Sequence, residues 1–150
     1  MLSTKMYNVT NKPSFSEKQE IVDFLHKHLE QFGDSKPDIT KSIDYALKEM
    51  ISFGGFVLVG FKDSEMLGAV VVNQTGMGGY IPENILVYIA THKDHRGKGL
   101  GKQLMKEAID TASGDIALHV EPDNPARFLY EKLGFSHKYS EMRLIKPTNN

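Results

Sequence analysis

The chain has 150 residues, of which 40% are apolar and 25% charged, and its formal net charge is −1 at pH 7. This length is enough for one ordinary hydrophobic core. A net charge so close to zero provides no overall basic field, so the composition gives no support to a nucleic-acid-binding role.

The sequence contains no cysteine, which excludes disulfides, thiolate metal ligands and a cysteine nucleophile. Residues 1–10 lack a basic stretch followed by an apolar one. The longest apolar run, Met66–Val72, is far shorter than the roughly 20 residues that span a bilayer. We therefore expect a cytoplasmic protein that is neither secreted nor inserted in a membrane.

The amino-terminal part predicts one strand followed by two helices. Residues 5–10 have the composition of a strand. Either Ser16 caps the first helix, or Ser14 does so and forms a capping box with Glu17. Apolar residues at helical spacing follow, and the same spacing predicts a second amphipathic helix over residues 39–51.

The period then changes from helix to strand. Phe56–Phe61 and Met66–Val72 are β-branched runs separated by the turn-like residues 62–65, which predicts an antiparallel hairpin. Residues 76–84 are rich in glycine and predict a loop before a strand over residues 85–92.

Strands and helices alternate in the second half. We predict a helix over 100–111, a strand over 116–120, a helix over 125–133, and late strands over 135–139 and 141–145. Hairpins followed by strand–turn–helix units indicate an α/β fold with a mixed, mostly antiparallel sheet flanked by helices.

No repeat or low-complexity segment interrupts the chain. We therefore expect a single domain over residues 1–150, with a loose tail at about 146–150.

The most informative stretch is the glycine-rich turn that opens the helix at 100–111. The first turn of a helix leaves backbone N–H groups unpaired, and the helix dipole favours an anion there. Arg96, Lys98 and Lys102 add positive charge. The turn predicts a phosphate or diphosphate site, the simpler alternative being that its glycines only shape a strand-to-helix turn.

Two well-known glycine motifs do not fit this turn. A Walker loop needs a glycine five residues before the glycine of its Gly-Lys pair and a Ser or Thr after the pair, where this chain has Arg96 and Gln103. A dinucleotide fingerprint beginning at Gly99 would need a third glycine where Leu104 stands.

The pattern Arg96-x-x-Gly99-x-Gly101 resembles the diphosphate-binding signature of the GNAT superfamily of acetyltransferases. The resemblance implies that backbone amides of this loop bind the diphosphate of coenzyme A, and that amides of the preceding strand hold the pantetheine arm and stabilise the oxyanion. The cofactor-binding residues that it implies here are Ala90, Thr91, His92, Arg96, Gly97, Lys98, Gly99, Leu100, Gly101 and Lys102.

Residues 124–135 are similar to a second GNAT signature, so the resemblance covers roughly residues 56–135. In the family this helix flanks the pantetheine arm, and the tyrosine that matches Tyr130 lies near the thioester sulfur, which implies a general acid for the departing thiolate. Asn124 precedes Tyr130 by six residues, where many members have seven. Asn124 therefore either contacts the coenzyme or only caps the helix.

The general base is not carried over from the family. Several relatives have a glutamate early on the strand, near the position of Ile85 in this chain, and the nearest candidates here are Glu83 and Tyr88. His92 and His95 could relay protons, or they are plain loop residues. No histidine pair has the spacing of a metal site, so we predict no metal.

The resemblance implies direct transfer of an acetyl group from acetyl-CoA, as co-substrate, to a primary amine. The acceptor would be either a small-molecule amine or an amine of a protein or peptide, with no nucleic-acid or membrane partner, and a homodimer stays open. The alternatives are a longer acyl chain, or a non-catalytic acyl-CoA-binding or regulatory module of the same fold.

Overall fold

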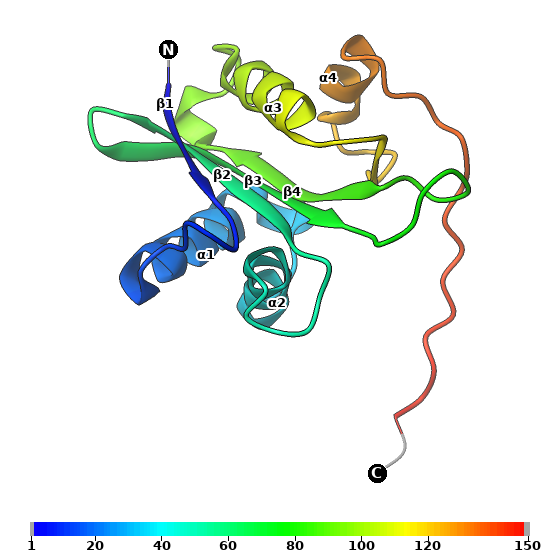
Figure 1. Ribbon diagram of the computed structural model, residues 1–150. Coiled ribbons are helices and arrows are strands. Elements are labelled where there is room, and N and C mark those ends of the chain that lie inside the picture. The colour runs from blue at the N-terminus through cyan, green and yellow to red at the C-terminus, as the bar shows by residue number, and fades with distance from the viewer. Residues whose placement is uncertain (1, 149–150) are drawn as a thin grey trace.

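The structure is a computed structural model that describes residues 2–148. Figure 1 shows a twisted sheet with helices on both faces. The strands are β1 (Ser3–Tyr7), β2 (Gly55–Lys62), β3 (Glu65–Gln74), β4 (Asn84–Thr91) and β5 (Ile116–Leu118). The α-helices are α1 (Phe15–Leu29), α2 (Lys36–Leu47), α3 (Leu100–Thr111) and α4 (Arg127–Lys132), and single 3-10 turns cover Glu30–Phe32 and Lys93–His95.

The strands lie side by side in the order β1-β2-β3-β4-β5. Neighbours pair antiparallel from β1 to β4, whereas β4 and β5 are parallel. The predicted α/β class with a mixed, mostly antiparallel sheet is confirmed.

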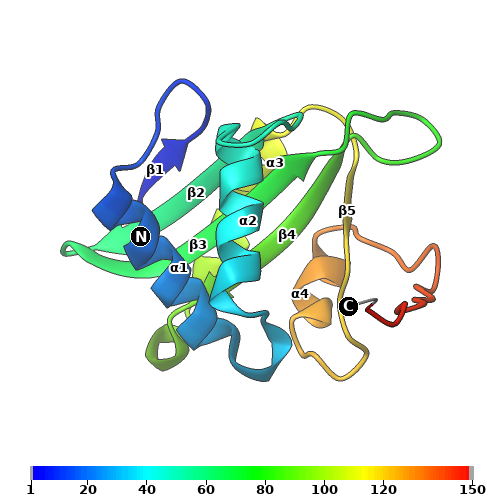
Figure 2. The same cartoon turned by 90° about the horizontal axis from the view of Figure 1, so that it is seen from below.

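The sheet separates two hydrophobic layers. Helices α1 and α2 cover one face and α3 and α4 the other (Figures 1 and 2). Because successive side chains of a strand point to opposite faces, β2 serves both layers: Val57 and Val59 face α1 and α2, while Leu58 faces α3. Across the described residues, no helix is both long and apolar enough to cross a membrane.

The first helix begins where the capping box predicted. The backbone N–H of Glu17 donates to the hydroxyl of Ser14 (3.1 Å), and the N–H of Ser14 donates to the Glu17 carboxylate (2.8 Å). Ser14, not Ser16, is therefore the cap. The strand predicted over 5–10 lies instead at Ser3–Tyr7, because Asn8 turns the chain by accepting hydrogen bonds from the N–H groups of Thr10 and Asn11.

The predicted range 39–51 of the second helix was wrong at both ends. Ser35 caps α2 three residues earlier than expected by accepting from the N–H of Asp38 (3.3 Å). The helix ends at Leu47, since Lys48 adopts a left-handed conformation (φ 56°) that cannot continue it.

The late strands predicted over 135–139 and 141–145 are not formed. Residues 135–148 have no regular secondary structure, and Tyr139, Met142 and Leu144 are more than four-fifths exposed. A strand needs a neighbouring backbone to pair with, and none of the described strands pairs with this segment. Strand β5 and helix α4 are likewise shorter than predicted. Of the predicted tail, 146–148 are exposed and 149–150 lie outside the described residues.

Candidate functional site

The glycine-rich turn joins the end of β4 to the start of α3. Gly97 and Gly99 have φ values of 79° and 81°, a left-handed backbone that glycine adopts without strain. Gly101 has a different role: a Cβ there would lie 3.3 Å from Leu129 of α4 and 3.7 Å from Thr91 of β4. Glycine at this position lets α4 and the end of β4 approach the first turn of α3.

The first turn of α3 presents free backbone donors. Its N-cap is Gly99, which has no side chain to cap the helix, and the first helical bond runs from the N–H of Gln103 to the carbonyl of Gly99 (3.1 Å). The N–H groups of Leu100, Gly101 and Lys102 make no hydrogen bond to any other residue in the range 2–148. This is the arrangement that binds a phosphate group at a helix N-terminus.

A positively charged cavity adjoins the same turn. It has a volume of about 250 Å³ and is lined by Lys62 from the end of β2, by His95 and Lys98 from the loop, and by three leucines. Two lysine side chains at a helix N-terminus add to the dipole and favour an anion there.

Arg96 binds the end of α1 and not the glycine turn. Its Nη2 donates to the backbone carbonyl of His28 (2.6 Å), and its Nη1 donates to the carboxylate of Glu30 (2.9 Å). The arginine of the glycine pattern thus joins the loop to the helix on the other side of the sheet.

Three histidine rings, one from α1 and two from the loop, contact one another. The ring centroids of His28 and His92 are 4.3 Å apart, and those of His92 and His95 are 5.1 Å apart. His28 is 4% exposed, and its Nδ1 accepts the N–H of Lys93 (3.1 Å). Burial, assisted by the charge of neighbouring cations, lowers the pKa of His28 to about 4. His28 is therefore neutral near pH 7 and holds the loop as a hydrogen-bond acceptor.

Strand β4 has a free edge next to this loop. Its pairing with β5 stops at Leu86, opposite Leu118, and Val87 is an extra residue in the pairing with β3. Beyond that bulge, β4 and β5 diverge (Figure 2). Since the N–H of His92 donates to Leu67 of β3 (2.8 Å), alternation along the strand turns the N–H groups of Thr91 and Ile89 towards the free edge.

The amides that face the free edge differ from those that the sequence predicted to hold the pantetheine arm. Ala90 and His92, both predicted from the sequence, direct their N–H groups into the sheet, whereas Thr91 has the required orientation. Sequence reasoning missed Ile89, because the bulge that fixes this alternation is a property of strand pairing. From Val87 to Thr91 the edge is roughly 13 Å long at about 3.3 Å per residue.

Two tyrosines lie on opposite faces of the sheet near this edge. Tyr130 of α4 belongs to the layer beneath α3 and packs edge-on against Phe135, with ring centroids 6.0 Å apart. Burial raises the pKa of Tyr130 to about 12, which keeps its hydroxyl protonated. Tyr88 belongs to the layer beneath α1 and α2, and its hydroxyl donates to Asp34 (2.5 Å). Burial, followed by the hydrogen bond to Asp34 and then by the charge of Asp34, raises the pKa of Tyr88 well above its ordinary value.

Asp34 was not a sequence candidate. It lies in the short loop before α2 and is 54 residues away from Tyr88 in the chain. A lone aspartate before a helix is typical of a cap, so nothing in the sequence distinguishes it.

The side chains of Glu83 and Asn124 both accept hydrogen bonds from backbone N–H groups. The N–H of Asp115 donates to the Glu83 carboxylate (2.8 Å), and this bond lowers the pKa of Glu83. Glu83 precedes the first residue of β4, so the length of that strand separates it from the glycine turn. The N–H of Ala126 donates to the side-chain oxygen of Asn124 (2.9 Å), which fixes the turn before α4. The predicted roles of Glu83 as base and Asn124 in coenzyme binding stay predictions.

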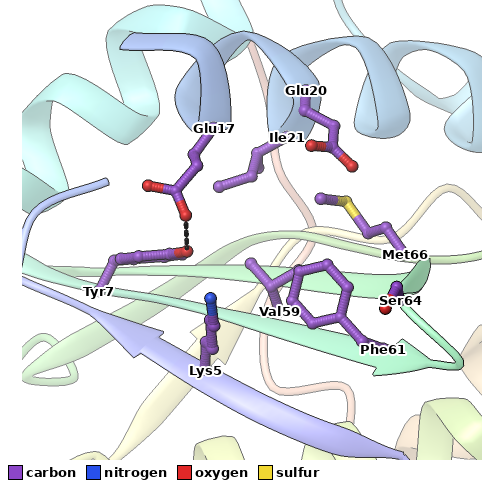
Figure 3. Close-up of a pocket in the computed structure, with 9 residues that line it drawn as sticks. All are labelled: Lys5, Tyr7, Glu17, Glu20, Ile21, Val59, Phe61, Ser64 and Met66. Carbon is purple, nitrogen blue, oxygen red and sulfur yellow. Dashed lines mark hydrogen bonds between the residues drawn. The ribbon is translucent and has the colours of Figure 1, made fainter. Parts of the chain in front are cut away.

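A smaller cavity of about 140 Å³ lies between α1 and the β1–β2–β3 end of the sheet. In Figure 3 the hydroxyl of Tyr7 points to the carboxylate of Glu17, whereas Glu20 and Ser64 lie apart from this pair. The hydroxyl of Tyr7 donates to Glu17 (3.1 Å), and the ammonium of Lys5 lies 5.9 Å from the ring centre of Phe61. The carboxylates of Glu17 and Glu20 line this cavity together with the ammonium of Lys5, so it does not favour an anion as the glycine turn does.

Comparison with known proteins agrees with the fold. Residues 21–135 match the acetyltransferase (GNAT) family. The chain belongs to the GNAT family of acetyltransferases. No curated protein sequence matches it.

Solved structures of acetyltransferases share the fold at low sequence identity. A ribosomal-protein-alanine N-acetyltransferase from Brucella melitensis biovar Abortus 2308 is 17% identical, with a TM-score of 0.68 over 98% of this chain and 100% of that one. An aminoglycoside antibiotic 6'-N-acetyltransferase from Acinetobacter haemolyticus is 16% identical, with a TM-score of 0.68 over 98% and 99%. A chain of the NatC complex bound to Gag peptide and CoA is 17% identical, with a TM-score of 0.71 over 92% and 86%.

Proposed function

We propose that this protein is an N-acetyltransferase that moves the acetyl group of acetyl-CoA directly to a primary amine. The observation that carries the proposal is the continuity of two donor sets: the unpaired amides at the start of α3, and the free edge of β4 that begins beside them. Membership of the GNAT family supports the reaction class.

The diphosphate of the carrier would lie against the amides of Leu100, Gly101 and Lys102, where the helix dipole favours it. The pantetheine arm would then run along β4, accepting from the N–H of Thr91 and placing the thioester near Ile89 and Val87. Both substrates are held in one place, so positioning supplies much of the acceleration.

The transfer step needs an acid for the departing sulfur. The amine nitrogen attacks the carbonyl carbon, the carbon–sulfur bond breaks with its electron pair on sulfur, and Tyr130 donates its proton to that sulfur. The proton lost by the amine returns to Tyr130 through solvent. Burial of Tyr130 supports this role, because its hydroxyl carries a proton throughout the neutral range.

Binding can be tested by thermal unfolding. Acetyl-CoA at a hundredfold excess over its Kd should raise the melting temperature by roughly 5 to 10 °C. Gly99→Val should abolish this shift, because φ 81° is closed to a β-branched residue and the amides would move. The matched control is Gly79→Val, which has the same strain (φ 79°) in the distant 76–84 loop and should keep the full shift. A full shift in Gly99→Val would remove the glycine turn from the site.

Release of free coenzyme A thiol over a panel of amines separates the enzyme from the alternative function. Turnover of any amine above the rate of hydrolysis supports the transferase. A thermal shift without turnover of any amine would instead favour the non-catalytic acyl-CoA-binding module.

A further inference from the structure

The loop before α2 brings a carboxylate to the edge at which the thioester is proposed to lie. The hydroxyl of Tyr88 donates to Oδ2 of Asp34 (2.5 Å), and Tyr88 is only 8% exposed. The buried Tyr88 of β4 thereby orients the exposed carboxylate of Asp34. The other carboxylate oxygen, Oδ1, accepts no hydrogen bond from residues 2–148.

Tyr88 and Asp34 lie beside the stretch of β4 at which the amine would approach the proposed thioester. Tyr88 directly follows Val87, the bulge beyond which the edge of β4 is free. Its side chain lies on the α1–α2 face, whereas Tyr130 lies on the α3–α4 face. A thioester at the edge between them would meet the amine from the Asp34 side and release its sulfur towards Tyr130.

The charges around Asp34 leave it available to a cation. Lys36, two residues away, is paired with Asp23 of α1 (2.9 Å). The charge of Asp34 also helps to raise the pKa of Arg143. However, Nε and Nη2 of Arg143 donate to the carboxylate of Glu141 (2.8 and 2.7 Å).

From these contacts we infer that Asp34, oriented by Tyr88, binds the ammonium group of the acceptor, so that the acceptors of this protein are cationic primary amines. The inference rests on the proposed N-acetyltransferase function and adds to it a binding residue and a substrate class. The ammonium is held by a charge-assisted hydrogen bond to Asp34. It loses one proton to water, which reaches the exposed Asp34, before the nitrogen attacks.

The test compares charged and uncharged nucleophiles in matched variants. The probes are the best alkylamine of the panel, which is a cation at pH 7.5, and hydroxylamine, which is mostly uncharged there. Asp34→Asn keeps the shape of the side chain but removes its charge, and Tyr88→Phe frees Asp34 without opening a cavity. The control is Asp38→Asn on the first turn of α2.

Asp34→Asn should raise KM for the alkylamine by about tenfold or more, as the loss of a hydrogen bond to a charged group does. KM for acetyl-CoA, turnover of hydroxylamine and the melting temperature should stay near the wild-type values. Tyr88→Phe should give a smaller change in the same direction, and Asp38→Asn should stay within about twofold of wild type.

Equal alkylamine KM in Asp34→Asn and wild type would overturn the inference, as would an equal loss for hydroxylamine, which would indicate a structural role. Failure of the proposed function is recognised separately, in the wild-type protein, as acetyl-CoA binding without turnover of either nucleophile. The inference would then fall with it.

Discussion

At the scale of single residues, the two tyrosines illustrate how burial assigns different tasks to one side-chain type. Tyr130 has no carboxylate among the causes of its raised pKa, so burial alone keeps its proton in place. The hydroxyl of Tyr88 instead donates a hydrogen bond to Asp34. A buried hydroxyl without a charged partner is free to act as a proton donor. A hydroxyl that is bonded to a carboxylate instead holds that carboxylate in one orientation.

Tyr130→Phe should lower kcat by about a hundredfold, the lower range for loss of a general acid, with little change in the KM for acetyl-CoA. Steady-state thiol release measures both constants. Tyr7→Phe is the control, since it removes another buried hydroxyl at the opposite edge of the sheet. Because the pKa of Tyr130 is about 12, wild-type activity should show no loss from its ionisation below about pH 11. Unchanged kcat in Tyr130→Phe would eliminate it as the acid.

At the scale of elements, the loop before α3 is held from the far face of the sheet. The end of α1 contacts this loop through Arg96, through Glu30 and through the His28–Lys93 hydrogen bond. The end of α1 therefore helps to set the position of the glycine turn. The arginine of the glycine pattern acts in this structure as a link between elements.

Glu30→Gln distinguishes this link from direct contact of Arg96 with the diphosphate. If Arg96 acts by holding the loop, loss of the carboxylate should loosen the loop and weaken acetyl-CoA binding severalfold. If Arg96 turns to the ligand, the same variant should tighten binding, since a competing carboxylate is gone. Calorimetric titration gives the sign, and Glu131→Gln on α4 is a control for the loss of one surface charge.

At the scale of the whole molecule, one sheet shared by two hydrophobic layers connects the site to overall stability. Residues from β2, β3 and β4 contribute to both layers. Loss of either layer would therefore expose one apolar face of the same three strands. This is the arrangement expected if residues 1–150 form one cooperative domain, as the sequence predicts. The rings of His28, His92 and His95 form a contact between α1 and the loop, which joins the candidate site to this core.

The buried His28 should make stability fall with acid. Its pKa is about 4 in the folded protein and 6.5 in the unfolded chain, so the unfolded chain binds more protons between these values. The stabilisation is complete above pH 6.5 and is lost as the pH falls towards 4, by about 1 to 3 kcal/mol. His28→Asn, which keeps an acceptor but does not titrate, should show a smaller drop in melting temperature from pH 7 to pH 5. The exposed His137→Asn should behave as wild type, and parallel curves for His28→Asn and wild type would contradict the assignment.

The sequence by itself determined the class of fold, the hairpin and the glycine turn, because each depends on side-chain period or on residues within one turn of one another. It offered the capping box of Ser14 and Glu17 as one of two helix starts, and the structure decided for it. It also indicated Tyr130, since its helix carries a family pattern. It misplaced the carboxyl end of α2, where the left-handed Lys48 stops the helix. It also predicted two late strands in a segment that is exposed and pairs with no other strand.

Only the tertiary structure decided which groups meet. The contacts of Arg96 with α1, of His28 with Lys93 and of Tyr88 with Asp34 join residues that are 54 to 68 positions apart. The free edge of β4 likewise depends on where β5 stops pairing. Local patterns report on neighbours in the chain, whereas these contacts follow from how the sheet is paired and which helix covers each face.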